Sequence, residues 1–205
     1  MAFHDRRTLD GVYSVRQSAR YVMNYRYAEE RMMRMMAGWI ALTPQLPVKL
    51  EMARQVYECA LHADALGKRL GELRSQAQVS RPPNEAFVGF INEIEDKEQW
   101  EDTIERLVGI HRVLKPHLIA HYSAHVAAAN PIYEPPTLRI LAHMVEDEKR
   151  HVERGLVVLG DLLDSAEAHR RAAQWQGHLE ELMAAAGGVT GFEEEENGAQ
   201  KIGRS

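Results

Sequence analysis

The strongest constraint in this sequence is the spacing of its apolar residues, which recur with the period of an α-helix along almost the whole chain. Four long apolar stripes occupy residues 14–43, 48–73, 99–129 and 136–163. The alternation typical of β-strands is absent, and no segment repeats another. The sequence therefore predicts an all-α protein.

The connections between the stripes indicate how the helices are arranged. Short turns at Thr43–Pro47 and Asn130–Pro136 join the first stripe to the second and the third to the fourth, so each pair should form an antiparallel hairpin. The connection between the second and third stripes is long, and it contains a short amphipathic segment with Phe87 and Ile91 on one face. We therefore expect two antiparallel hairpins joined by one long crossover.

One further helix and a tail complete the expected organisation. The segment Ser165–Ala186 predicts an extra helix that packs outside the four-helix bundle. Residues 1–186 should then form a single helical domain. Residues 187–205 include the run Glu193–Glu196 and are expected to form a flexible acidic tail.

Composition excludes several classes of protein. With 25 basic and 30 acidic residues the net charge is −5, which gives no basic surface for nucleic acid. The single cysteine, Cys59, excludes a disulfide framework. No apolar run reaches the roughly 20 residues of a membrane helix, and no signal peptide is recognisable. We therefore expect a cytoplasmic protein without a membrane partner, and its ten histidines call for an explanation.

The fourth stripe contains two polar residues where apolar ones are expected. Glu148 falls at the centre of the stripe, between Val145 and Val152, and His151 lies one turn further on. A carboxylate in such a position is costly unless it is paired or bound to a metal. The two candidate explanations are therefore a metal site and a buried ion pair with an arginine such as Arg26.

Groups that can bind a metal lie at the same level on the other three helices. At 1.5 Å per residue, each lies roughly 18 Å from its hairpin turn. The set comprises Glu29 or its neighbour Glu30 on the first helix, Glu58, Cys59 and His62 on the second, and His117 and His121 on the third. We expect these groups to meet Glu148 and His151 in one layer. The other inward histidines, His111, His125 and His143, are interpreted as core residues.

On these residues the chain resembles the ferritin-like superfamily of di-iron and di-manganese carboxylate proteins. The resemblance covers roughly residues 14–163, and Glu148-Lys-Arg-His151 is its sharpest element. It implies a four-helix bundle with metal ligands Glu29, Glu58, His62, His117, His121, Glu148 and His151. Two positions depart from the family pattern, because Cys59 stands where the second helix usually carries Glu and histidines stand where the third helix does.

The resemblance also implies a function. We expect iron, mononuclear or dinuclear, with manganese as the alternative, and an oxidase or oxygenase that uses O2 on a small organic substrate. A catalytically inactive metal-binding or scaffold bundle is the second interpretation, and iron storage is a third. Whether the extra helix mediates a homodimer stays open.

Overall fold

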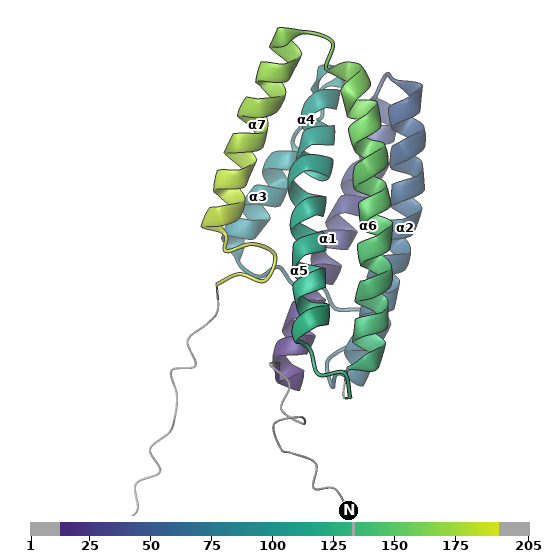
Figure 1. The fold of residues 1–205 in the computed structure, drawn as a ribbon, viewed down its shortest axis with the longest axis vertical. Coiled ribbons are helices and arrows are strands. Elements are labelled where there is room, and N and C mark those ends of the chain that lie inside the picture. Colours follow the sequence, from purple (N-terminus) through teal and green to yellow (C-terminus); the bar gives the residue numbers. More distant parts are fainter. Residues whose placement is uncertain (1–12, 133, 193–205) are drawn as a thin grey trace, which may run out of the picture.

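A computed structural model describes residues 13–132 and 134–192, and all the regular structure in these residues is helical (Figure 1). The elements in chain order are α1 (Val15–Leu42), α2 (Leu46–Glu72), α3 (Glu85–Glu95), the 3-10 turn η2 (Trp100–Asp102), α4 (Thr103–Val108), the π-helical turn η3 (Gly109–Leu114), α5 (Lys115–Ala128), α6 (Pro135–Leu162) and α7 (Ala166–Ala185). The all-α prediction is confirmed.

The first hairpin begins and turns where local chemistry requires it. Ser14 and Gln17 form a capping box: the Gln17 N–H donates to Ser14 Oγ at 3.2 Å and the Ser14 N–H to Gln17 Oε1 at 2.9 Å. Pro44 follows the last turn of α1, and Pro47 lies in the first turn of α2, where its missing N–H costs no helical hydrogen bond. Helices α1 and α2 pack along their length, as α5 and α6 do, and α2 also packs on α6.

The long crossover carries the short helix that its sequence pattern predicts. The apolar face of α3 is fully buried and consists of Phe87, Phe90, Ile91 and Ile94. Helix α7 packs against α3 and α4, on the side of the molecule away from α2 (Figure 1). It therefore lies outside the four long helices, as expected.

The third long helix differs from the sequence prediction in one respect. The stripe at 99–129 predicts one long helix, but the helical path contains a π turn, η3, shortly before Pro116. Within it the Lys115 N–H donates to the Ile110 carbonyl five residues back. One extra residue in a turn rotates all later side chains by about 100° relative to an unbroken α-helix. Lys115 and Tyr122 are thereby fully buried.

The segment after α7 returns to the bundle. The Ala186 carbonyl accepts a hydrogen bond from the Asn84 side chain at 2.9 Å, and Val189 is completely buried. Residues 187–189 thus pack against the bundle, although they belong to the expected tail, whereas Phe192 is exposed. Residues 193–205, which make up the rest of that tail, lie outside the described residues. Within the described part of the chain, no helix combines the length and the apolar character needed to cross a bilayer.

The contact between α6 and the π turn generates the first prediction. A Cβ added at Gly155 would lie 2.0 Å from Cδ2 of the buried His111 ring. We expect Gly155→Ala to lower the free energy of unfolding by about 1–3 kcal/mol, because the ring has to move. Urea denaturation measures this. Gly160→Ala on the same helix is the control: nothing lies within 4 Å of its Cβ, so it should be neutral or stabilising by up to about 1 kcal/mol.

Candidate metal centre

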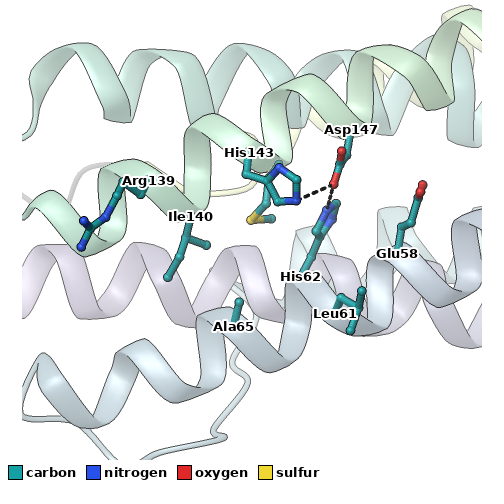
Figure 2. Close-up of a pocket in the computed structure, with 9 residues that line it drawn as sticks. Glu58, Leu61, His62, Ala65, Arg139, Ile140, His143 and Asp147 are labelled. Atoms are coloured by element: carbon teal, nitrogen blue, oxygen red, sulfur yellow. Dashed lines mark hydrogen bonds and ion pairs between the residues drawn. The ribbon is translucent and has the colours of Figure 1, made fainter.

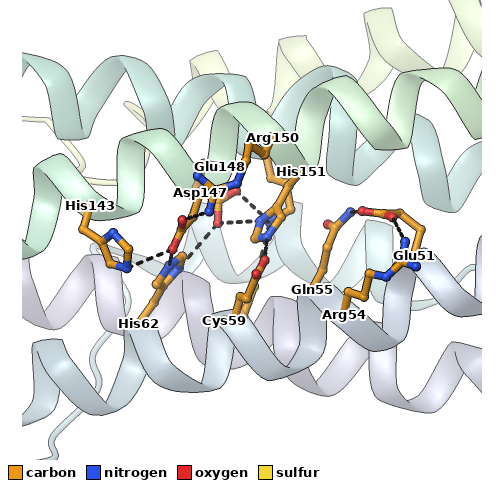
Figure 3. A network of polar contacts seen from close by, with 12 residues as sticks. Glu51, Arg54, Gln55, Cys59, His62, His143, Asp147, Glu148, Arg150 and His151 are labelled. Carbon is orange, nitrogen blue, oxygen red and sulfur yellow. Dashed lines mark hydrogen bonds and ion pairs between the residues drawn. The ribbon is translucent and has the colours of Figure 1, made fainter.

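Four long helices bring a set of polar side chains into the middle of the bundle. Figure 3 shows part of this network between α2 and α6. The set comprises Glu29 from α1, Cys59 and His62 from α2, Lys115 and Tyr122 from α5, and Glu148 and His151 from α6, and all seven are buried. The expectation of one shared layer thus holds for Glu29, His62, Glu148 and His151.

The centre of this set is an ion pair. The ammonium of Lys115 donates to Glu148 Oε2 at 2.6 Å, and both side chains are fully buried. Burial opposes the charge of Lys115, but the neighbouring side chains of Cys59, Glu148 and Glu29 raise its pKa. Burial likewise opposes the charge of Glu148, yet Lys115 and His151 lower its pKa to about 2. The pair is therefore charged at neutral pH.

Lys115 also determines the tautomer of His151. Its Nζ lies 3.1 Å from His151 Nδ1, and because an ammonium can only donate, Nδ1 must accept. The ring proton of a neutral His151 then resides on Nε2, which contacts the carboxylate of Glu58. Cys59 Sγ is the third neighbour of Nζ, at 3.8 Å. Burial raises the pKa of Cys59 well above that of a free thiol, so Cys59 remains protonated.

His62 occupies the opposite side of Glu148. Its Nδ1 lies 3.3 Å from Glu29 Oε2 and 3.6 Å from Glu148 Oε1, and its Nε2 lies 3.1 Å from Asp147 Oδ2. Burial would lower the pKa of His62, but these carboxylates together raise it to about 9. Tyr122 completes the arrangement, since its hydroxyl donates to Glu29 Oε1 at 2.9 Å.

The donor atoms fit one divalent cation. Glu29, Cys59 and Glu148 each offer a ligand atom, and these atoms lie within 4.8 Å of one another. Glu148 Oε1 is buried without a hydrogen-bond partner, 3.4 Å from His151 Nδ1 and 3.6 Å from His62 Nδ1. Buried polar atoms are normally satisfied by protein, water or an ion, so this carboxylate oxygen is available as a ligand. A second ion beside His151 would meet the ammonium of Lys115, so the residues do not fit a dinuclear site.

Several sequence alternatives are resolved by these positions. On α1 it is Glu29 that points inward, because Glu30 pairs with Arg26 at 2.7 Å and accepts from Ser80. Arg26 also donates to the Ala63 carbonyl, so it is not the partner of the buried glutamate. Glu148 does form a buried ion pair, and its cationic partner is Lys115 instead of an arginine. Glu58, from the rim of the set, contacts His151 from outside.

His117 and His121 are not brought to this set. The π turn rotates them to another face of α5, where their rings lie 4.3 Å apart. His117 Nε2 accepts the Val189 N–H at 2.9 Å, and both histidines line a pocket with Gly188. Burial, together with the neighbouring His121, lowers the pKa of His117 to about 4, so the ring is neutral when it accepts. In the metal layer their expected place is taken by Lys115.

Three functional side chains were missed by the sequence analysis. In an unbroken helix, Lys115 and Tyr122 would lie about 95° and 75° from the centre of the stripe formed by Leu107, Ile110, Leu114 and Leu118, so the constant period placed them outside it. Asp147 carried a usable signal, because it lies four residues after His143 on the face toward α2. His143 itself was expected in the core but is exposed, with Nε2 3.4 Å from Asp147 Oδ2.

An aromatic row continues from Tyr122 toward the end of the bundle. The ring centroids of Tyr122 and Tyr25 lie 4.9 Å apart, those of Tyr25 and Tyr21 6.5 Å, and those of Tyr21 and Tyr13 5.2 Å. These distances are typical of packed aromatic pairs. The Tyr25 hydroxyl lies 3.3 Å from Nδ1 of His125, and His125 is buried, which agrees with its interpretation as a core residue. The row holds the Tyr122 hydroxyl against Glu29.

A pocket between α2 and α6 leads to the outer side of His62 (Figure 2). Its volume is about 340 Å³. It is lined by Glu58, Leu61, His62 and Ala65 from α2 and by Arg139, Ile140, His143, Met144 and Asp147 from α6. The His62–Asp147 contact forms the wall between this pocket and the buried carboxylates.

The Lys115–Glu148 pair generates a stability prediction for the metal-free protein. We expect Lys115→Met to lower the free energy of unfolding by about 3–5 kcal/mol, because it leaves a buried carboxylate unpaired. Adding Glu148→Gln should recover most of the loss, since the double variant holds no uncompensated charge. Lys149→Met, which breaks the exposed 2.9 Å pair with Glu146, is the control and should cost under about 1 kcal/mol. Equal losses in both single variants would contradict the ion-pair assignment.

His125 generates a pH prediction. Burial lowers its pKa to about 4, against about 6.5 in the unfolded chain, while Glu134 opposes the shift. As the pH falls, the unfolded state therefore binds the proton first. The contribution of neutral His125 to the free energy of unfolding is present above about pH 6.5 and is lost as the pH falls toward 4. Between about pH 7 and pH 4.5 the loss amounts to about 2–3 kcal/mol. Urea denaturation should show a shallower pH dependence for His125→Phe, and an unchanged one for the exposed His178→Phe.

Comparison with known proteins assigns no family. No family model matches the chain, and neither curated proteins nor solved structures give a significant match. What the site can do therefore follows from its own residues.

Proposed function

We propose that this chain is a ferritin-like protein that binds one metal ion, iron in the first instance, and that it acts as an O2-dependent oxidase or oxygenase. Glu29 and Glu148 would hold the ion, with His62 Nδ1 as the third donor in place of the protonated thiol of Cys59. The observation that carries the proposal is the buried Glu148 Oε1, which has no hydrogen-bond partner and lies 3.6 Å from His62 Nδ1.

The donor set supports this choice of metal. Two carboxylates and one imidazole suit Fe(II) and Mn(II), whereas a site for Mg²⁺ or Ca²⁺ would consist of oxygen ligands. A bound iron ion would supply the activation of O2. It would take the place of the proton that His62 Nδ1 carries between Glu29 and Glu148 in the metal-free protein.

The surrounding residues prepare the ligands. Asp147 accepts from His62 Nε2, which fixes the ring so that Nδ1 points to the carboxylates. The Tyr122 hydroxyl holds one oxygen of Glu29 and leaves the other facing His62. Lys115 neutralises one charge of the two buried carboxylates and occupies the side of Glu148 toward His151.

The same lysine supports a second candidate function. With Lys115 bound to Glu148, the polar core is stable without any metal, as a binding or scaffold bundle would require. The two candidates differ in one measurable quantity, the affinity of the purified chain for Fe(II).

Metal titration tests the proposal. We expect the purified chain to bind one Fe(II) per chain, measured anaerobically by equilibrium dialysis with elemental analysis. Glu29→Gln and His62→Ala should each weaken binding by at least about tenfold, because each removes a ligand. His117→Ala is the matched control and should bind as the unaltered protein does. O2 consumption by the loaded protein, lost in His62→Ala, tests the oxidase activity.

Lys115→Glu tests the number of ions. A carboxylate at this position removes the ammonium and adds a ligand beside His151, so the variant should bind two ions per chain. Lys115→Met removes the charge without adding a ligand, so this variant should not bind a second ion. If the unaltered chain binds no Fe(II) or Mn(II), the scaffold candidate replaces the metal protein.

A further inference from the structure

We propose that the pocket between α2 and α6 binds a small amphipathic carboxylate, with its head group on Arg139 and its hydrocarbon chain directed toward His62 and Asp147. The role of this ligand as the substrate of the oxidase rests on the proposed function. Its binding to the pocket is independent of that function.

The middle of the pocket is apolar. Leu61 and Ala65 of α2 face Ile140 and Met144 of α6 across it (Figure 2). Leu61 is half exposed, at 50%, although it lies in the middle of a long helix. Burying such surfaces against a hydrocarbon chain contributes roughly 25 cal/mol per Å², so this stretch favours an apolar ligand segment.

The two ends of the pocket differ in whether their charged groups are already paired. Arg139 is exposed at one end, and it makes no hydrogen bond or ion pair with any residue of 13–132 or 134–192. Glu58 and Asp147 lie toward the other end, where Glu58 pairs with His151 and Asp147 pairs with His62, His143 and Arg150 (Figure 2). An anionic head group is attracted to the unpaired guanidinium of Arg139, whereas the cationic groups at the second end already have carboxylate partners. Charge therefore sets the direction in which the ligand lies.

The length of the pocket limits the ligand. Arg139 and Asp147 are eight residues apart on α6, which corresponds to about 12 Å along the helix. An extended saturated chain of about nine or ten carbons spans this distance. The cavity volume of about 340 Å³ lies at the lower end of the range for small-molecule sites. Decanoate is therefore a suitable probe, and decan-1-ol is its uncharged counterpart.

Arg139 should determine which of the two probes is preferred. We expect the metal-free chain to bind decanoate at least about tenfold more tightly than decan-1-ol at low ionic strength, measured by isothermal titration calorimetry. Arg139→Gln should remove this preference by weakening decanoate alone. Arg154→Gln, an exposed arginine on α6 outside the pocket, is the matched control and should retain it. Leu61→Glu should weaken both probes.

Each outcome decides the inference separately from the proposed function. Failure of decanoate to bind, or equal binding by Arg139→Gln and the unaltered chain, overturns the inference even if Fe(II) binds as expected. Conversely, Arg139-dependent binding in a chain that takes up no Fe(II) supports the pocket and refutes the oxidase. When the iron-loaded protein is given O2 and an added two-electron reductant, so that one oxygen atom enters decanoate and the other leaves as water, hydroxylation near the end remote from the carboxylate supports the orientation. Hydroxylation next to the carboxylate overturns it.

Discussion

The ion pair between Lys115 and Glu148 is the interaction on which the centre of this protein depends. Two carboxylates, those of Glu29 and Glu148, lie in the interior of a helical bundle, where an uncompensated charge costs several kcal/mol. The lysine compensates one of them and at the same time holds His151 in a single tautomer. The remaining negative charge is met by His62, which is why the imidazole is cationic in the absence of metal. In the absence of metal, the charges of the two carboxylates are thus compensated by Lys115 and His62, and a cation could replace the proton of His62.

The two sides of the centre have different surroundings. Beyond Tyr122 a packed row of aromatic rings reaches toward the end of the bundle and leaves little freedom to Glu29. Beyond His62 lies the open pocket between α2 and α6. A rigid side and an accessible side are what a site needs when it must fix its ligands and still admit a small molecule.

Much of the fold followed from the sequence because it depends on local chemistry. The caps, the prolines and the apolar period predicted the all-helical fold, the extents of α1 and α2, and the packing of α3 and α7. The inward positions of Glu148 and His151 were also predictable, and so was an inward carboxylate at Glu29 or Glu30, because α1 and α6 are regular from end to end. The third long helix was not predictable in the same way. Whether a turn is α or π depends on its tertiary contacts, and the choice decides whether Lys115 or His117 faces the centre.

The π turn also determines which deletions the third long helix can tolerate. Removing one residue from 109–114 would convert the turn to regular α-helix and leave Lys115 and Tyr122 facing the same way, because the missing residue is the one that the bulge holds. Removing a second residue would have no bulge to absorb it, and would turn both side chains away by about 100°. The third long helix can therefore lose one residue from the π turn without changing which side chains face the centre, but it cannot lose a second.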